Sequence, residues 1–148
     1  MDLELISRDG VRGVALLAKV LDNTLHAHGL SPSQYRLLVF LLEKPSAATA
    51  LAQRLDVTRP SLTGLVDGLV AKGFVVREPD PSDRRRVTHQ ISTAGRAAVH
   101  RADEALQARL DQILANVEPA DAAGSTAAAL EHWRSAIIAT RASEKATR

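Results

Sequence analysis

Apolar residues recur every three or four positions along most of this chain, and this spacing predicts a largely helical protein. The first long helix is predicted by four such residues near the N-terminus: Val14, Leu17, Leu21 and Leu25. We expect it to end at Gly29, because glycine adopts the left-handed conformation that closes many helices.

A second helix is predicted to begin after Ser31, whose side chain can cap the first turn. Pro32 suits the first helical position, where an N–H group is not needed. We expect this helix to bury a stripe made of Tyr35, Leu38, Leu41 and Leu42. A short third helix follows, and we expect Ser46 to cap it.

The next helix, over residues 58–72, follows the third after only the dipeptide Asp56-Val57, with Thr58 as its cap. Two short helices joined this tightly predict a helix-turn-helix. The predicted core face is Leu62, Leu65, Val66, Leu69 and Val70. The opposite face carries Gly64 and Gly68, and glycine costs a helix about 1 kcal/mol relative to alanine. Either this face approaches another surface closely, or it is a solvated face of poor helix formers.

Two β-branched runs, "FVVRE" and "RVTHQIS", follow that helix and can pair across "PDPSDRR" as a hairpin. A helix-turn-helix followed by such a hairpin predicts a winged helix, so the fold class is mainly α with a small β-wing. The arginines of the tip suit a groove lined by phosphates. We expect Asp80 and Asp83 to hold these arginines in fixed rotamers. The alternative is a charged network that only stiffens a solvated loop.

Composition narrows the function. The 148 residues are 45% hydrophobic and can bury one sizeable core, and their net charge is only +2. Residues 77 to 101, however, contain six arginines and only three acidic residues. The chain has no cysteine, which excludes disulfides, thiolate chemistry and a cysteine-based oxidant sensor. Without a secretion signal or a long apolar run in the sequence, we expect a cytoplasmic protein with no membrane partner.

A metal site or an enzyme is not predicted. His100 shares a helix face with Asp103 or Glu104, but the sequence holds no dense cluster of ligands around them. It contains no nucleophile elbow, phosphate-binding glycine loop or zinc-protease motif. We therefore expect no catalytic residue, no metal and no cofactor.

The segment between Leu30 and Arg96 resembles the DNA-binding core of the MarR family of bacterial transcriptional regulators. The resemblance rests on "LAQRL", "LVDGLVAKGFVVR" and "DPSDRRR…ISTAGR", in the family's order. It implies a recognition helix over 58–72 and a wing over 74–92. Many members carry arginine or another polar residue at Gly64 and Gly68, so base contacts shift to the N-terminal end of this helix. The DNA-binding residues expected are Thr58, Arg59, Ser61, Thr63, Arg84, Arg85 and Arg86.

The two ends of the chain are predicted to form a helical dimerisation region, residues 1–30 and 93–148, around a DNA-binding region at 31–92. Helices here carry bulky apolar residues among alanines: Val99, Leu106, Leu110, Ile113, Leu114, Val117, Leu130, Trp133 and Ile137. A two-fold dimer presents two recognition helices to half-sites about 34 Å apart.

The function predicted is a homodimeric, ligand-responsive repressor that binds a pseudo-palindromic operator in double-stranded DNA. The family implies a small organic effector near the first two helices, where His26 and Tyr35 are candidate contacts. Asp67 or Asp83 is expected to pair with a tip arginine, above all Arg85, and so to orient the wing. The alternative function is a winged-helix dimer that binds small molecules or proteins without specific DNA binding.

Overall fold

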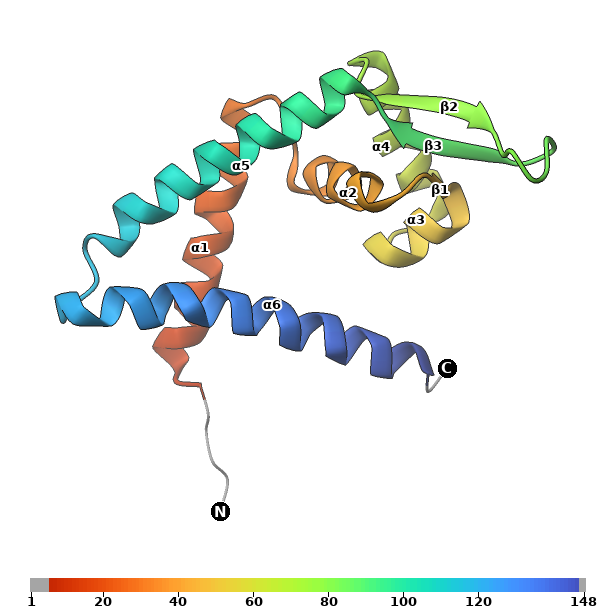
Figure 1. The fold of residues 1–148 in the computed structure, drawn as a ribbon. Coiled ribbons are helices and arrows are strands. Elements are labelled where there is room, and N and C mark those ends of the chain that lie inside the picture. The colour runs from red at the N-terminus through yellow and green to blue at the C-terminus, as the bar shows by residue number, and fades with distance from the viewer. Residues whose placement is uncertain (1–5, 147–148) are drawn as a thin grey trace. The chain divides into compact units, whose positions relative to one another are not determined.

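A computed structural model of the chain describes residues 6–146, which form helices and one small antiparallel sheet (Figure 1). The predicted fold class is confirmed. The elements are α1 (Arg8–Ala27), α2 (Pro32–Glu43), β1 (Ser46–Ala47), α3 (Ala48–Leu55), α4 (Arg59–Ala71), β2 (Val75–Pro79), β3 (Val87–Ile91), α5 (Thr93–Leu114), a 3-10 turn (Ala120–Ala122) and α6 (Ala123–Ala146).

The chain forms two compact units that divide within α5, after Leu106. The first unit holds α1 to α4, the sheet and most of α5. The second begins at Gln107 and holds the end of α5, the 3-10 turn and α6. The predicted division into a DNA-binding region, residues 31–92, and a dimerisation region, residues 1–30 and 93–148, is a division by function. It stays a prediction.

Local sequence determines where the helices begin. The Ser31 hydroxyl accepts a hydrogen bond from the Gln34 N–H, and the Gln34 side chain accepts one from the Ser31 N–H, which completes a capping box on α2. The Thr58 hydroxyl caps α4 in the predicted way. Gly29 and Gly73 follow α1 and α4 with φ of 75° and 72°, a conformation that side chains with a Cβ rarely adopt.

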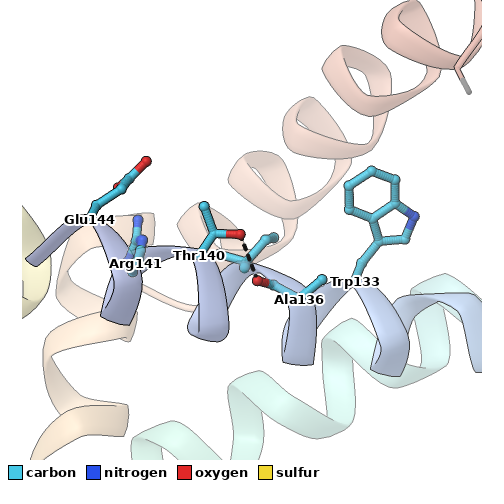
Figure 2. A pocket seen from close by; sticks show the side chains of 6 residues that line it. Trp133, Ala136, Thr140, Arg141 and Glu144 are labelled. Carbon is cyan, nitrogen blue, oxygen red and sulfur yellow. Dashed lines mark hydrogen bonds between the residues drawn. The ribbon is translucent and has the colours of Figure 1, made fainter. Parts of the chain in front are cut away.

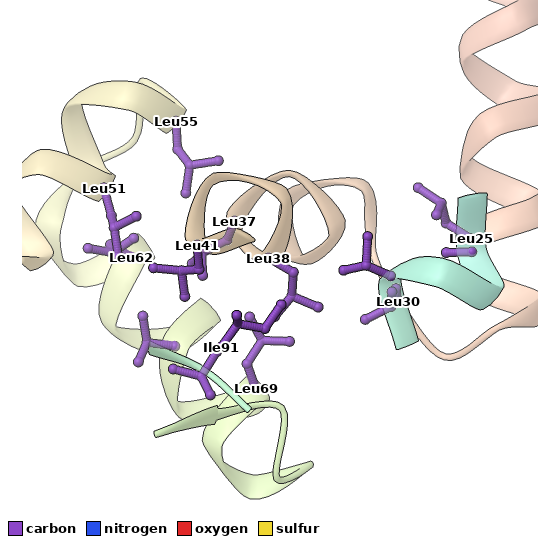
Figure 3. Packing of buried hydrophobic residues seen from close by; sticks show 14 of the residues in the cluster. Leu25, Leu30, Leu37, Leu38, Leu41, Leu51, Leu55, Leu62, Leu69 and Ile91 are labelled. Atoms are coloured by element: carbon purple, nitrogen blue, oxygen red, sulfur yellow. The ribbon is translucent and has the colours of Figure 1, made fainter. Parts of the chain in front are cut away.

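One core joins the elements of the first unit, and α2 lies at its centre (Figure 3). Leu37, Leu38 and Leu41 of α2 are at most 1% exposed. The predicted burial of Leu42 is wrong, because its side chain is 37% exposed and Leu37 is buried instead. Six of the last seven residues of α2 are apolar or aromatic and they lie on every side of the helix, so periodicity alone could not locate the buried face.

The sheet has three strands in the order β1-β3-β2, and both pairings are antiparallel. The sequence did not predict β1. Ser46 lies in this strand opposite His89, and its hydroxyl donates to the Lys44 carbonyl. The predicted cap of α3 by Ser46 is therefore wrong: the N-cap is Ala47, which has no side chain able to cap. Ser46 pairs with His89 as part of β1, so it lies one residue before the N-cap position of α3.

The start of α5 packs directly on the end of the hairpin. Ser92 caps α5 by accepting from the Gly95 N–H, and its hydroxyl donates to the Gly73 carbonyl. A Cβ at Gly95 would lie 2.2 Å from the Phe74 carbonyl oxygen, far inside contact distance. Only glycine permits this approach, so the α5 axis is positioned by the base of the wing.

Candidate nucleic-acid interface

Helix α4 buries its predicted apolar face and exposes the other. Leu62, Val66 and Leu69 are at most 2% exposed, and they face the core of the first unit. The exposed positions include the predicted DNA contacts of this helix: Thr58, Arg59, Ser61 and Thr63. An exposed polar strip on the second helix of a helix-turn-helix is the surface that enters the major groove in this class of protein.

Hydrogen bonds within the helix already use part of this strip. The Thr58 hydroxyl donates to the Ser61 hydroxyl at 2.9 Å. The Thr63 hydroxyl donates to the Arg59 carbonyl at 3.1 Å. Ser61 therefore keeps its own proton as a donor for an outside partner, while Thr58 and Thr63 keep only acceptor lone pairs.

The two glycines of α4 have different surroundings. A Cβ at Gly68 would lie 3.1 Å from the Gln34 side-chain nitrogen, so Gly68 allows close packing against α2 of the same chain. A Cβ at Gly64 would have no neighbour within 4 Å. The close-approach explanation thus holds for Gly68 within the protein, and Gly64 faces open space.

The tip of the hairpin is shaped by its aspartates. The Asp80 carboxylate accepts from the Ser82 N–H at 2.8 Å and from the Ser82 hydroxyl at 2.6 Å. These bonds hold the pKa of Asp80 below its ordinary value. The expectation that Asp80 holds an arginine in one rotamer is wrong, because its carboxylate closes the turn on Ser82 instead.

The three tip arginines are not equivalent. Arg86 approaches Asp83, with 3.8 Å between Nε and the carboxylate oxygen. The side chains of Arg84 and Arg85 make no hydrogen bond or ion pair with any residue that the structure describes, and both are exposed. Two guanidinium groups at the tip are therefore available to an anionic partner such as a phosphate.

The predicted partner of Asp67 is wrong. Asp67 on α4 accepts a hydrogen bond from the Arg77 guanidinium on β2, and not from Arg85. Asp83 accepts from the backbone N–H of Arg85 at 3.0 Å, and the tip arginine whose side chain it approaches is Arg86. The expected pairing of Asp83 with a tip arginine therefore holds for Arg86 and not for Arg85. Strands extend about 3.3 Å per residue, so the turn beyond Pro79 begins roughly 7 Å past Arg77. The arginine that contacts α4 is therefore Arg77, in the middle of β2, and not an arginine of the tip.

A buried histidine lies in the middle of β3, and sequence reasoning missed it. His89 on β3 is 5% exposed, and its Nδ1 donates to the Ser46 carbonyl at 3.2 Å. It pairs in register with Arg77 of β2. Burial lowers the pKa of His89 and outweighs the Ser46 hydrogen bond, and the Arg77 charge acts in the same direction as burial.

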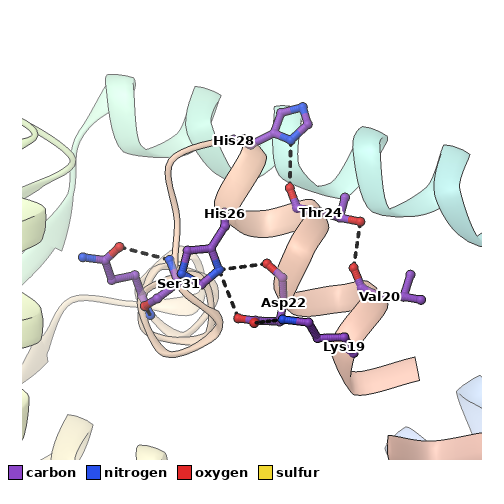
Figure 4. A network of polar contacts seen from close by, with 8 residues as sticks. Lys19, Val20, Asp22, Thr24, His26, His28 and Ser31 are labelled. Atoms are coloured by element: carbon purple, nitrogen blue, oxygen red, sulfur yellow. Dashed lines mark hydrogen bonds and ion pairs between the residues drawn. The ribbon is translucent and has the colours of Figure 1, made fainter. Parts of the chain in front are cut away.

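The two candidate effector contacts belong to separate networks. The Tyr35 hydroxyl donates to the Asp103 carboxylate at 2.5 Å and joins α2 to α5. Burial, followed by this hydrogen bond, raises the pKa of Tyr35. His26 on α1 instead points at Asp22 on its own helix, with its Nδ1 3.0 Å from the carboxylate (Figure 4).

Another histidine, His100, lies on α5. Its Nε2 is 3.3 Å from the Glu104 carboxylate, while the Asp103 carboxylate accepts the hydrogen bond from Tyr35. Within residues 6–146, histidines and acids form no group of three that could hold a metal. No helix in the same range is long and apolar enough to cross a membrane.

Helix α6 of the second unit exposes much of its apolar surface. Trp133, Ile137 and Ile138 are each 50% to 53% exposed, and Leu130 is 38% exposed. A shallow groove follows one side of the helix, lined by Trp133, Ala136, Ile137, Thr140, Arg141 and Glu144 (Figure 2).

Comparison with known proteins gives a consistent picture. A sequence profile described as MarR family matches residues 28–86. The HTH-type transcriptional repressor YetL of Bacillus subtilis (strain 168) is 33% identical over 81 residues, which cover 53% of this chain and 48% of YetL. This chain spans about half the length of the curated relatives it matches.

Solved structures match over more of the chain. The transcriptional regulator BldR from Sulfolobus solfataricus is 32% identical, with a TM-score of 0.63 over 84% of this chain and 86% of BldR. The transcriptional repressor CouR from Rhodococcus jostii RHA1, solved on a 23-mer DNA duplex, is 24% identical, with a TM-score of 0.69 over 86% of this chain and 92% of CouR. The likeness to CouR shows the fold alone.

Proposed function

This chain belongs to the MarR family, and on that basis we propose that it is a homodimeric transcriptional regulator that binds double-stranded DNA. One observation carries the proposal: the exposed polar strip of α4 and the free guanidinium groups of Arg84 and Arg85 belong to adjoining elements of one unit. The named relatives are transcriptional regulators, which supports the same interpretation.

DNA binding would divide between the two elements. α4 lies in the major groove, where Arg59, Ser61 and Thr63 meet base edges, and Thr58 contacts the backbone at the start of the helix. The wing reaches the neighbouring minor groove, where Arg84, Arg85 and Arg86 neutralise phosphates. Phosphate contacts set affinity and base contacts set sequence preference.

The dimer would form through the helical regions 1–30 and 93–148. The apolar side chains that α6 exposes are the main support, because a monomer in water would leave Trp133, Ile137 and Ile138 half exposed. Trp133 is the only tryptophan, so its emission reports this surface directly. We expect its emission to shift to shorter wavelength as the protein concentration rises, together with a sedimentation change from one chain to two. A concentration-independent monomer with a solvent-exposed indole would contradict the dimer.

A small organic effector would regulate DNA binding, and the protein would act as a repressor in the cytoplasm. YetL and CouR are named as repressors, and CouR has also been solved with p-coumaroyl-CoA. An effector that binds better to a DNA-incompetent arrangement shifts the population toward it. Tyr35, which joins α2 to α5, and His26 at the end of α1 are the proposed contacts.

Selection of bound sequences from random duplex DNA tests this function. We expect a pseudo-palindrome with half-sites about one helical turn apart, and weaker binding when an effector from a small-molecule library is added. A purified dimer that enriches no sequence would contradict specific DNA recognition and favour the alternative, an interaction module for small molecules or proteins.

A further inference from the structure

A side-chain contact joins the two helices of the helix-turn-helix at their N-terminal ends. Arg59 is the first residue of α4, and its Nη2 donates a hydrogen bond to the Thr49 hydroxyl in the first turn of α3. Both residues are exposed. Leu51 of α3 and Leu62 of α4 are at most 2% exposed in a shared core, so the two helices are held together independently of this contact.

The contact leaves most of the guanidinium available. Arginine carries five N–H donors in a planar fork, and only one of them is used on Thr49. Arg59 makes no other side-chain hydrogen bond or ion pair within residues 6–146. The hydrogen bond therefore restrains a long side chain that would otherwise sample many rotamers, and it leaves the remaining donors free.

The surroundings leave Arg59 as the strongest donor on this surface. Thr63 has already donated its hydroxyl proton to the Arg59 carbonyl. Gly64 faces open space and has no side chain to contribute. In the major groove, guanine presents two adjacent acceptors, O6 and N7. A guanidinium group can bind both of them with two parallel hydrogen bonds.

We propose that Arg59 reads a guanine in each operator half-site, and that Thr49 is the positioning residue that holds its guanidinium for this contact. The inference rests on the proposed function, because it requires α4 to lie in the major groove. It adds a residue of α3 to the determinants of sequence preference, although Thr49 itself reads no base. The advantage is preorganisation: the rotamer is fixed before DNA binds, so less freedom is lost on binding.

The test is selection from random duplex DNA with the full-length protein and three variants. Arg59→Ala should lose preference for guanine at one position of each half-site, by roughly five- to a hundredfold relative to the other bases. Thr49→Val has nearly the same shape but no hydroxyl, and it should lose about two- to tenfold of the same preference. Thr49→Ser restores the hydroxyl and should restore the preference.

Two further readouts separate positioning from a general defect. The salt dependence of Thr49→Val should match that of wild type, because the charge of Arg59 is kept. Its melting temperature should match that of Thr49→Ser within about a degree, because the contact is exposed. If Arg59→Ala weakens all sequences alike, Arg59 contacts phosphate and the inference fails. If wild type shows the guanine preference and Thr49→Val keeps it in full, the positioning role fails. A wild-type protein that selects no sequence would overturn the proposed function itself.

Discussion

Arg77 on β2 donates a hydrogen bond to the carboxylate of Asp67 on α4, so the wing is joined to the recognition helix in mid-strand and not at its tip. The Asp67 side chain is 57% exposed and the Arg77 side chain 41%, so the pair lies at the protein surface. An aspartate on the surface proposed to meet DNA repels phosphate unless its charge is matched. Arg77 matches it, and we propose that the pair also orients the hairpin relative to α4.

Replacing Asp67 with asparagine should weaken DNA binding, although it removes a negative charge next to DNA. The reason is that a loosened wing must be ordered again when DNA binds. Because the pair is exposed, the free energy of unfolding should fall by only about 0.2 to 1 kcal/mol. Titration of a labelled duplex measures the affinity, with Asp56→Asn, at an exposed position before α4, as the matched charge control. Tighter binding by Asp67→Asn would show that the pair does not orient the wing.

Replacing Arg85 with alanine should weaken binding to many sequences alike, because its free guanidinium is proposed to bind phosphate. Arg86→Ala removes the same charge from a side chain that approaches Asp83 at 3.8 Å, so its effect should be smaller. Ser61→Ala should instead change which bases are preferred, since Ser61 keeps a free donor. Selection profiles for the three variants check this prediction. Profiles that cannot be told apart would contradict the division between wing and helix.

The stability of the first unit should fall as pH drops below about 6.5, because of His89. Burial lowers the pKa of His89 in the folded state, so the unfolded chain binds its proton first and acid favours unfolding. His89→Gln cannot titrate, and it should lose less stability than wild type between about pH 7.5 and pH 5. Equal pH dependence in His89→Gln and wild type would exclude His89 as the source.

Tyr35 is the only tyrosine, so the absorbance of tyrosinate reports its ionisation alone. We expect wild type to titrate well above the ordinary tyrosine pKa of 10.0, because burial and the Asp103 carboxylate both disfavour the phenolate. Asp103→Asn should lower this pKa without restoring the ordinary value, since burial is the larger cause. Identical titrations for wild type and Asp103→Asn would contradict the link between α2 and α5.

Much of the fold follows from local signals in the sequence. The caps at Ser31 and Thr58 and the positive φ at Gly29 depend on residues close together in the sequence, and all three were predicted. The apolar face of α4 was predicted because its polar and apolar positions alternate at helical spacing.

The wrong or missing predictions concern contacts between residues that are distant in sequence, or a choice among several residues of the same type. A two-residue strand such as β1 has no periodicity, and its pairing with β3 joins Ser46 to His89 across 43 residues. Asp67 had several arginines within reach in the sequence, and only the hairpin register places Arg77 beside it. The Thr49–Arg59 contact was also missed, because it joins two different helices and neither residue belongs to a distinctive sequence motif.

The salt dependence of DNA binding tests the central claim most directly. If each protomer neutralises about four phosphates, the dimer displaces about eight counterions, and raising salt from about 50 to 200 mM should weaken binding to a selected duplex by roughly 10⁴-fold. Removing the free arginines, as Arg84→Ala with Arg85→Ala, should reduce the slope by about the number of charges lost per dimer. A nearly flat response in wild type, or a slope that the double variant leaves unchanged, would contradict DNA binding through α4 and the basic wing.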